Sequence, residues 1–487
     1  MKRLANLTLI LISAIRSGGQ PSSYFELFID YGSLEEGLAA VYSNDTVWAT
    51  SGSGQMGTGY GTIDAVSNGD TSLIHRMFGK PTWFIGIRDL VRVPAGGLIG
   101  SVNFKPTLFS RFAYGLVRFT STGDTLWSRF YIVDPAFNDI CHSLVSTVDS
   151  GYAIIGGSKH VDSVGAEIRL IKTDADGNMD WYRDYGLPGS RWENAYDLVQ
   201  LPDSGYIISG FRDFLNGKRQ LLLIRTDKDG SQLWEKTYGG QYKDWGGYVT
   251  KSMEGGFMLS GYKSLDPNND SGRAQIFKVD DSGAMQWSRT YKTPRMLLGS
   301  FERVEQLPDS SYVFIGHAID RDTVCGYNMG WIVKTDRFGN ELWNRTYTRN
   351  CDNHNYFWDF APTPDGGFVV CGTTHNATQD AWLLKLDSLG CNAPSCDTVV
   401  GVIYVPLPAM QLEVWPNPTD GVVHVRLPVR KVDKIEVVDL MGRVSPLLGR
   451  GVGGEAITAD MTGLPSGVYV VRIEADGRIL QAKVVKR

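Results

Sequence analysis

Short apolar runs separated by turn residues recur along most of the chain, with a period of about 53 residues. Each unit predicts four strands. The first ends in a Pro-Asp-Gly-type turn, the second ends in glycine, and an Asp-x-x-Gly turn joins the third to the fourth. In one unit these turns lie at Leu201–Gly205 and Asp227–Gly230, with apolar strands at 206–210 and 221–225. Four short antiparallel strands in such a repeat are typical of a β-propeller blade.

The fourth strand of the unit carries a motif in which Gly follows Asp by three residues, Trp follows Gly by four, and Tyr follows Trp by four. The complete motif occurs at Asp174-Gly177-Trp181-Tyr185, Asp227-Gly230-Trp234-Tyr238, Asp280-Gly283-Trp287-Tyr291 and Asp336-Gly339-Trp343-Tyr347. A further copy, Gly123-Trp127-Tyr131, has Thr120 in place of the aspartate. Asp and Gly suit a tight turn, because Asp caps its own backbone and Gly tolerates positive φ. We expect the tryptophans to pack between neighbouring sheets.

The glycines that end the second strands count seven units: Gly52, Gly100, Gly156, Gly210, Gly261, Gly316 and Gly372. The last unit stops at residues 387–390, and no Trp–Tyr strand follows it. Residues 24–32 resemble the end of a unit that has no beginning. We therefore predict an all-β, seven-bladed β-propeller in which this N-terminal strand completes the last blade and removes the exposed sheet edges. An open, unclosed solenoid is the alternative.

The loops of the predicted blades differ between the two faces of the propeller. The turns after the first and third strands are short and uniform, whereas the loops after the second and fourth strands are long and irregular. Because alternate connections of an antiparallel sheet lie at opposite ends, the variable loops share one face, where function is expected. Trp192, Trp245, His354 and Trp358 are the ligand-binding candidates on this face, suited to sugar rings or peptide. The competing interpretation is that each fills a gap between blades.

Composition narrows the class of protein. A chain of 487 residues is too long for one ordinary core, and its net charge of −5 argues against nucleic acid as a partner. Glycine (56), tryptophan (13) and tyrosine (22) are abundant, which fits an all-β protein with many tight turns. No internal stretch approaches the roughly 20 apolar residues of a transmembrane helix, so no transmembrane segment is predicted.

The N-terminus reads as a secretory signal peptide. Met1-Lys2-Arg3 is basic, residues 4–15 are apolar, and Ser17-Gly18-Gly19 supplies small residues for cleavage. We predict a signal peptide at 1–19 and a propeller at 20–396. A buried strand or helix is the alternative.

The six cysteines of an exported chain suit disulfide bonds. Two pairs are disulfide candidates: Cys325 with Cys351, in loops of one blade on the same face, and Cys391 with Cys396, at the exit from the propeller. Cys141 and Cys371 belong to different blades and are expected to be buried thiols. None of the cysteines has the spacing of metal ligands.

The repeat ends after Cys396. Residues 397–410 form an apolar linker, and 411–487 alternate as expected for a small Ig-like β-sandwich. This tail carries four ordered motifs: Trp415-Pro416-Asn417-Pro418, Asp439-Leu440-Met441-Gly442-Arg443, Leu464-Pro465-Ser466-Gly467-Val468-Tyr469 and Lys483-Val484-Val485-Lys486-Arg487. With Gly421 before a strand, they resemble the type A C-terminal sorting domain of the type IX (Por) secretion system of Bacteroidetes. An ordinary adhesive sandwich is the alternative.

The resemblance implies export across the outer membrane by the type IX machinery, removal of the tail, and attachment to surface lipopolysaccharide or release. The implied sorting-signal residues are Pro416, Asn417, Pro418, Gly442, Gly467, Tyr469, Lys483 and Lys486. The propeller is similar to the tryptophan-rich repeats that often precede such tails, and that similarity carries no known activity.

One column of residues on the first strands is expected to line the central channel: Leu38, Asp89, Ser143, Asp197, Tyr248, Arg303 and Asp359. Paired carboxylates can hydrolyse glycosides, but a water-filled channel is also normally polar. Residues 174–180 imitate the start of a calcium loop, although the other copies lose its carboxylates, so that a hairpin turn explains all of them. No catalytic residue, metal or cofactor is assigned.

The sequence therefore predicts a secreted or surface-displayed binding or adhesion module for an extracellular glycan or protein. The alternative is an extracellular hydrolase acting on polysaccharide or peptide.

Overall fold

The chain forms two compact units, residues 1–395 and 396–487, each described here from a computed structural model. The described residues are 25–29, 35–43, 46–53, 60–67, 73–79, 84–106, 111–160, 165–187, 191–268, 271–293, 296–320, 327–349, 353–375, 379–392, 413–415, 418–420, 422–426, 434–439, 444–446, 457–475 and 478–487. The predicted signal peptide lies outside them. Every named element in these ranges is a β-strand, and no helix in them is long and apolar enough to cross a membrane.

The first unit is built from four-stranded antiparallel sheets, seven of them within the described ranges. Six consist of consecutive strands: β2 (Glu35–Ser43), β3 (Thr46–Ser53), β4 (Tyr60–Ser67) and β5 (Leu73–Gly79); β6 (Phe84–Arg92), β7 (Leu98–Lys105), β8 (Ala113–Phe119) and β9 (Thr125–Tyr131); β10 (Phe137–Ser146), β11 (Tyr152–His160), β12 (Glu167–Thr173) and β13 (Met179–Tyr185); β14 (Trp192–Gln200), β15 (Tyr206–Asp213), β16 (Arg219–Thr226) and β17 (Gln232–Tyr238); β18 (Trp245–Lys251), β19 (Phe257–Ser264), β20 (Gly272–Val279) and β21 (Met285–Tyr291); and β22 (Met296–Gln306), β23 (Tyr312–Asp320), β24 (Met329–Thr335) and β25 (Glu341–Tyr347).

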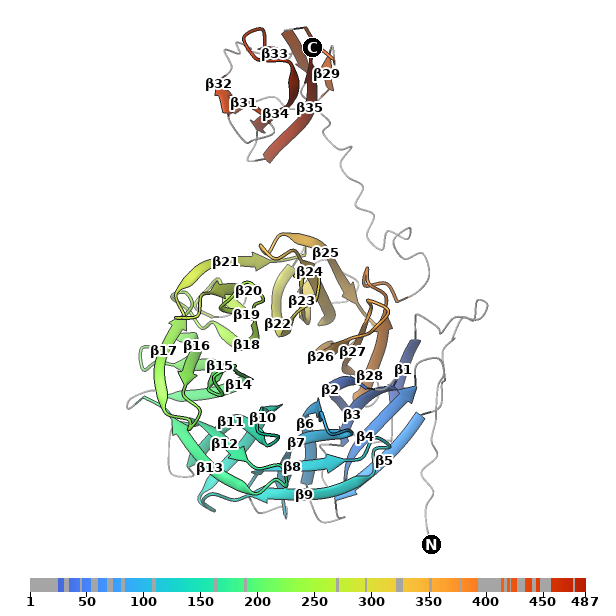
Figure 1. Ribbon diagram of the computed structural model, residues 1–487, viewed down its shortest axis with the longest axis vertical. Coiled ribbons are helices and arrows are strands. Elements are labelled where there is room, and N and C mark those ends of the chain that lie inside the picture. Colours follow the sequence, from blue (N-terminus) through green and yellow to red (C-terminus); the bar gives the residue numbers. More distant parts are fainter. Residues whose placement is uncertain are drawn as a thin grey trace. The chain divides into compact units, whose positions relative to one another are not determined.

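One sheet joins the two ends of this unit. It contains β26 (Asn355–Pro362), β27 (Phe368–His375) and β28 (Gln379–Leu386), and its fourth strand is β1 (Phe25–Ile29). Strand β1 pairs antiparallel with β28, from Phe25 opposite Lys385 to Ile29 opposite Ala381. Figure 1 shows the sheets of this unit placed around a central axis, with their first strands innermost. This arrangement is a β-propeller.

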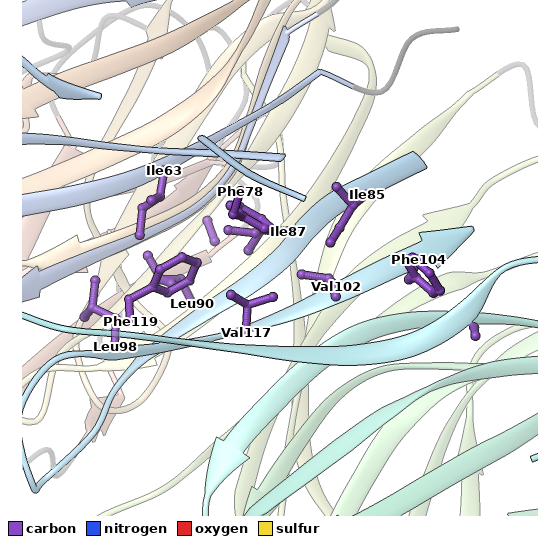
Figure 2. Close-up of a cluster of buried hydrophobic side chains, with 12 residues drawn as sticks. Ile63, Phe78, Ile85, Ile87, Leu90, Leu98, Val102, Phe104, Val117 and Phe119 are labelled. Carbon is purple, nitrogen blue, oxygen red and sulfur yellow. The ribbon is translucent and has the colours of Figure 1, made fainter. Parts of the chain in front are cut away.

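Apolar side chains of neighbouring sheets form the core. In one cluster, Ile63 of β4 and Phe78 of β5 pack with Ile87, Leu90 and Val117 of the next sheet (Figure 2). All five are buried, because the two sheet faces interlock and exclude water from the space between them. Equivalent clusters occur between the later sheets.

The Gly-Trp-Tyr part of the repeated motif joins each sheet to the next. Each tyrosine hydroxyl donates a hydrogen bond to the glycine carbonyl of the following turn: Tyr131 to Gly177 (2.8 Å), Tyr185 to Gly230 (2.7 Å), Tyr238 to Gly283 (2.7 Å), Tyr291 to Gly339 (2.7 Å) and Tyr347 to Gly390 (2.6 Å). The tryptophan of the same strand lies against the same glycine. The expectation that these tryptophans pack between sheets is confirmed.

Replacing Gly283 with alanine is expected to destabilise the protein by about 2–4 kcal/mol. Its φ is +76°, and a Cβ would lie 2.9 Å from Cζ3 of Trp234. Gly217 is the matched control, because its φ is +83° but a Cβ there meets nothing within 4 Å. Gly217→Ala should therefore cost only the backbone strain, about 1–2 kcal/mol. Urea denaturation measures both, and equal losses would show that the tryptophan contact contributes nothing.

The second unit contains two sheets in its described part. A three-stranded sheet has the order β29 (Glu413–Trp415), β30 (Val422–Arg426), β33 (Ile457–Asp460). A four-stranded sheet has the order β32 (Val444–Pro446), β31 (Lys434–Asp439), β34 (Gly467–Ala475), β35 (Arg478–Lys486). Val423, Val425, Val437, Val471 and Val484 are buried.

Candidate functional site

The polar residues predicted for the channel meet at its centre. The guanidinium of Arg303 contacts three carboxylates: Nε lies 2.9 Å from Asp359 Oδ1, Nη2 lies 3.1 Å from Asp89 Oδ1, and Nη1 lies 3.3 Å from Asp197 Oδ1. Ser143 Oγ donates to Asp89 Oδ2 at 2.8 Å and to Asp197 Oδ1 at 3.0 Å. We call these five residues the hub. They come from the first strands of five sheets.

A β-bulge on each contributing strand brings the hub to the axis. The register shifts between Ile87 and Asp89, and equivalent shifts precede Ser143, Asp197, Arg303 and Asp359. The extra residue kinks the strand and redirects the side chain that follows it.

The hub carboxylates also bind backbone amides of the following sheets. Asp89 Oδ2 accepts from the N–H of Leu144 in β10 at 2.9 Å. Asp197 Oδ2 accepts from Val249 in β18 at 3.1 Å, and Asp359 Oδ2 accepts from Ala40 in β2 at 3.0 Å. Each aspartate therefore fastens its own sheet to the next one.

The predicted column needs one correction, in β2. The amide that Asp359 binds belongs to Ala40, and it matches the amides of Leu144 and Val249 in the other sheets. The residue level with the hub is consequently Ala39, not Leu38. The register of β2 shifts by one residue between Gly37 and Ala40, and the sequence alone did not locate this bulge.

Burial and the central guanidinium act in opposite directions on the pKa values of Asp197 and Asp359. Burial raises the pKa of Asp197 to about 6, although Arg303 lowers it. Burial also raises the pKa of Asp359 against the opposing effect of Arg303. Burial disfavours the charged form of Arg303, but the three carboxylates outweigh it and hold its pKa well above the usual value. The cation is therefore permanently charged, and it balances only part of the negative charge around it.

A cavity of about 390 Å³ extends from the hub along the C-terminal ends of the first strands. We call it the cup. Its lining includes Val91, Val145, Thr250 and Ala361, which lie two residues beyond the hub level of their strands. Glu305 is the equivalent residue of β22. Burial raises the pKa of Glu305 to about 8, with Asp359 adding to the shift and Arg303 opposing it.

A stacked series of aromatic rings lies on the other side of the hub, on β26 and the residue before it. The rings of His354 and Tyr356 are 5.6 Å apart and those of Tyr356 and Trp358 are 5.2 Å apart, both nearly parallel. We call these three residues the aromatic ladder. His317 of β23 meets the Tyr356 ring edge-on at 5.1 Å, and Tyr327 meets His354 at 4.9 Å. Tyr327 is 41% exposed, which leaves one ring of the group open to solvent.

Polar contacts hold the ladder in place. Trp358 Nε1 donates to Thr373 Oγ1 at 2.9 Å, and Asn328 Nδ2 donates to the Tyr356 hydroxyl at 2.7 Å. His354 lies next to His375, and burial lowers the pKa of His354. The ladder therefore presents neutral, apolar ring faces at neutral pH.

The four ligand-binding candidates do not form one group. His354 and Trp358 belong to the ladder, where Tyr356 connects them. Trp192 lies under the ammonium of Lys159, 4.9 Å from its ring centroid, and Trp245 stacks on Tyr262 at 4.2 Å. Tyr356 was missed from the sequence, although 356 and 358 alternate along β26, directly after His354, and so share a face.

The described cysteines fit roles other than metal binding. Cys141 and Cys371 are free and buried, as predicted, and burial raises the pKa of Cys141 to about 12. Cys391 is disulfide-bonded. Cys325, Cys351 and Cys396 lie outside the described residues.

The turn that imitates a calcium loop has a structural explanation. Asp174 Oδ1 accepts hydrogen bonds from the amides of Asp176 (3.0 Å) and Asn178 (2.8 Å). Asp227, Asp280 and Asp336 make the same pair of contacts in their turns. Across the described ranges, no group of three or more His, Cys, Asp or Glu side chains is arranged to hold a metal ion.

Two of the sorting-signal residues, Lys486 and Tyr469, hydrogen-bond to backbone carbonyls of residues 462–465 in the second unit. Lys486 is buried, and its ammonium donates to the carbonyls of Thr462 (3.0 Å) and Leu464. The Tyr469 hydroxyl donates to Pro465 O at 2.8 Å. Gly467 and Lys483 lie in paired strands, and Pro418 is exposed. Pro416, Asn417 and Gly442 lie outside the described residues.

Known proteins resemble the chain in two ways. Residues 413–487 match a family model described as a secretion system C-terminal sorting domain. The fold and this tail define the class, an exported all-β protein with a β-propeller. The tail is a C-terminal sorting domain of the type IX secretion system, and the chain is a substrate of that system that is attached to the cell surface or released from it. No curated protein matches the chain significantly.

Solved structures resemble it weakly. PorZ of Porphyromonas gingivalis, a surface component of the type IX secretion system, aligns with a TM-score of 0.42 and 11% identity, covering 92% of this chain and 59% of PorZ. The β-propeller domain of the Trilobed protease from Pyrococcus furiosus gives 0.43 and 9%, covering 72% and 93%. A mutant Trypanosoma rangeli sialidase gives 0.41 and 11%, covering 99% and 88%. These TM-scores lie below 0.5, so no site residue or activity is transferred.

Proposed function

We propose that the protein is a secreted or cell-surface binding or adhesion module with a closed, seven-bladed propeller at residues 20–396. In this proposal 1–19 is a signal peptide, 397–410 a linker, and 411–487 an Ig-like sandwich that the type IX machinery recognises. The pairing of β1 with β28 supports ring closure, since it places the N-terminal strand in the last sheet of the unit.

The state of the hub carboxylates is the observation that most favours binding over catalysis. Acid–base hydrolysis needs two carboxyl groups free to act on a substrate. Asp89, Asp197 and Asp359 instead each engage Arg303 and a backbone amide, which makes them structural hydrogen-bond acceptors. The hub thus serves the fold.

The aromatic ladder is the proposed ligand surface. Flat, rigid rings bind sugar or peptide at low entropic cost, and aromatic residues dominate the energy of many recognition surfaces. Tyr327 and His354 extend this surface from the channel towards the long loops, where the sequence varies between blades. The ligand class is an extracellular glycan or peptide.

The full chain, tested on glycan and peptide arrays, should bind a ligand whose affinity falls about tenfold in Tyr327→Ala and in His354→Ala. Tyr182→Ala is the matched control, because Tyr182 is similarly exposed (39%) but lies on the outer strand β13. The control should bind as tightly as the native chain. Equal binding by all variants would exclude the ladder, and Trp192→Ala and Trp245→Ala would then test the other candidates.

An extracellular hydrolase acting on polysaccharide or peptide is the second candidate, and Glu305 is the observation in its favour. A carboxyl that keeps its proton at neutral pH inside a cavity is suited to general acid catalysis. Turnover of an extracellular polymer that disappears in Glu305→Gln would establish this alternative.

A further inference from the structure

One acidic side chain in the cup, Glu305, differs in type from the residues at the same position of the other sheets. At the position of Glu305, the other first strands carry Val91, Val145, Val199, Thr250 and Ala361, each two residues beyond the hub level. Small and apolar residues are therefore sufficient to build this layer. Among the described residues, the carboxyl of Glu305 makes no hydrogen bond or ion pair. An unpaired acid in a partly buried position costs free energy, which makes it a candidate for ligand binding.

The charges around the cup favour a cation. Its floor holds the carboxylates of Asp89, Asp197 and Asp359 against the single guanidinium of Arg303. That guanidinium already contacts all three hub carboxylates. Arg92 is exposed at the rim and lies outside this network. The interior therefore carries excess negative charge, and concave, low-dielectric walls strengthen its potential.

Part of the wall of the cup is apolar. Val91 and Val145, both partly buried, line it, whereas Leu90, Leu144 and Phe360 border it but belong to the cores between the sheets. Its volume of about 390 Å³ is in the range of small-molecule sites. A hydrated metal ion would leave these walls uncovered, whereas an alkyl chain would bury them. The cup therefore places apolar wall surface beside the unpaired carboxyl of Glu305.

We propose that the cup binds a small organic cation, with an alkylammonium group paired to the Glu305 carboxylate and its alkyl chain packed on the valine-rich wall. This site goes beyond the proposed glycan or peptide surface, from which the hub separates it along the channel. The two sites use different residues and can be tested independently.

The proposal predicts a defined pH dependence. The charged groups that face Glu305 are Arg303 on its own strand, Asp89 and Arg92 of β6, Asp197 of β14 and Asp359 of β26. Because burial raises the pKa of Glu305 to about 8, most molecules hold its proton at pH 7. Binding of an ammonium must release that proton, so affinity rises with pH up to about 8 and then levels off.

Calorimetry of the full chain with n-pentylammonium and with neutral 1-pentanol tests this site. At about pH 8.5, pentylammonium should bind at least tenfold more tightly than pentanol, and binding at about pH 7 should release protons to the buffer. Glu305→Gln and Glu305→Val should each lose at least tenfold in affinity and all pH dependence. The valine variant copies Val91 and Val145, which keeps the layer well packed.

Glu341→Gln is the matched control, since it removes the same charge from an exposed residue of β25 outside the cup, and it should bind like the native chain. Equal binding of pentanol and pentylammonium would reduce the cup to an apolar pocket and overturn the proposal. Binding retained in Glu305→Gln, competition by Mg²⁺ or Ca²⁺ alone, or absence of binding by the native chain at about pH 8.5 would also overturn it. Tyr327→Ala should leave this binding intact, so its outcome is independent of the ladder.

Discussion

Replacing Arg303 with methionine is expected to lower the free energy of unfolding by about 3–5 kcal/mol at neutral pH. The three carboxylates around it are only 5%, 11% and 8% exposed, so water cannot replace the lost guanidinium. Methionine preserves the apolar volume of the side chain but offers no hydrogen-bond donor. The variant is left with buried, uncompensated negative charge, and this is among the most costly single changes in a protein interior.

The loss should depend on pH in a specific direction. Arg303 holds down the pKa values of Asp197 and Asp359 against the effect of burial, so its removal raises both. A carboxyl whose pKa is raised by folding destabilises the native state once the unfolded chain ionises. The deficit of Arg303→Met should therefore be largest above about pH 6 and shrink in acid, where the carboxyls are neutral.

Urea denaturation at about pH 4.5 and about pH 7.5 measures this effect. Arg183→Met is the matched control: Arg183 lies over the Trp181 ring at 5.6 Å on the surface, and its loss should cost no more than about 1 kcal/mol. Adding Asp359→Asn to Arg303→Met should recover part of the loss, because it removes one buried charge. A cost below about 1 kcal/mol at neutral pH, or a cost that does not change with pH, would contradict the hub as a stabilising element.

The repeat made the blades predictable, because each strand pair depends on turn residues close in sequence. Asp227, Gly230, Trp234 and Tyr238 are fixed by local spacing, and their contacts with the next blade repeat wherever the motif does. Register was harder to predict. The sequence aligned Gly100 with Gly156, but the structure does not. Gly156 pairs with Cys141 directly before the bulge of its sheet, and the residue in that position of the earlier sheet is Val102, which pairs with Ile87.

The sites depend on information that local spacing lacks. Arg303 reaches Asp89, which is 214 positions away, only because the ring brings the first strands together. The bulges add a second difficulty. Trp358 joins the ladder and Asp359 joins the hub, although they are adjacent, because the bulge between Phe357 and Asp359 interrupts the alternation of side chains. The column of first-strand residues therefore predicted which residues form the hub, but it did not predict the contacts between Arg303 and the three aspartates.

Hub and cup also explain each other in physical terms. Three aspartates join neighbouring sheets through backbone amides, and one arginine makes their burial tolerable. The same arrangement leaves the channel with more negative than positive charge. Glu305 lies two residues beyond Arg303 in the chain. The carboxylates of Asp359 and Asp197 repel a negative charge on its side chain. Its proton is retained mainly because of burial, and the carboxylates of Asp359 and Asp197 add to this effect on its pKa.

Replacing Glu305 with glutamine is expected to stabilise the protein at alkaline pH and to leave it unchanged in acid. The unfolded carboxyl ionises near its ordinary pKa of 4.5, whereas the folded one keeps its proton until about pH 8. Between these values the native state binds more protons than the unfolded state, so the native chain loses stability as pH rises. Glutamine cannot ionise and avoids this loss. The difference between variant and native chain should be close to zero at about pH 4 and reach roughly 2–4 kcal/mol at about pH 8.5.

Denaturation curves of both proteins across this pH range, without added amines, provide the measurement. Glu341→Gln, at an exposed site, should show no pH-dependent difference from the native chain. If Glu305→Gln followed the native curve at every pH, Glu305 would ionise normally, and the cup would not hold it in its neutral form. If the variant gained stability and also lost pentylammonium binding, the same carboxyl would be shown to oppose folding and to serve a ligand, which is the pattern expected of a residue kept for function.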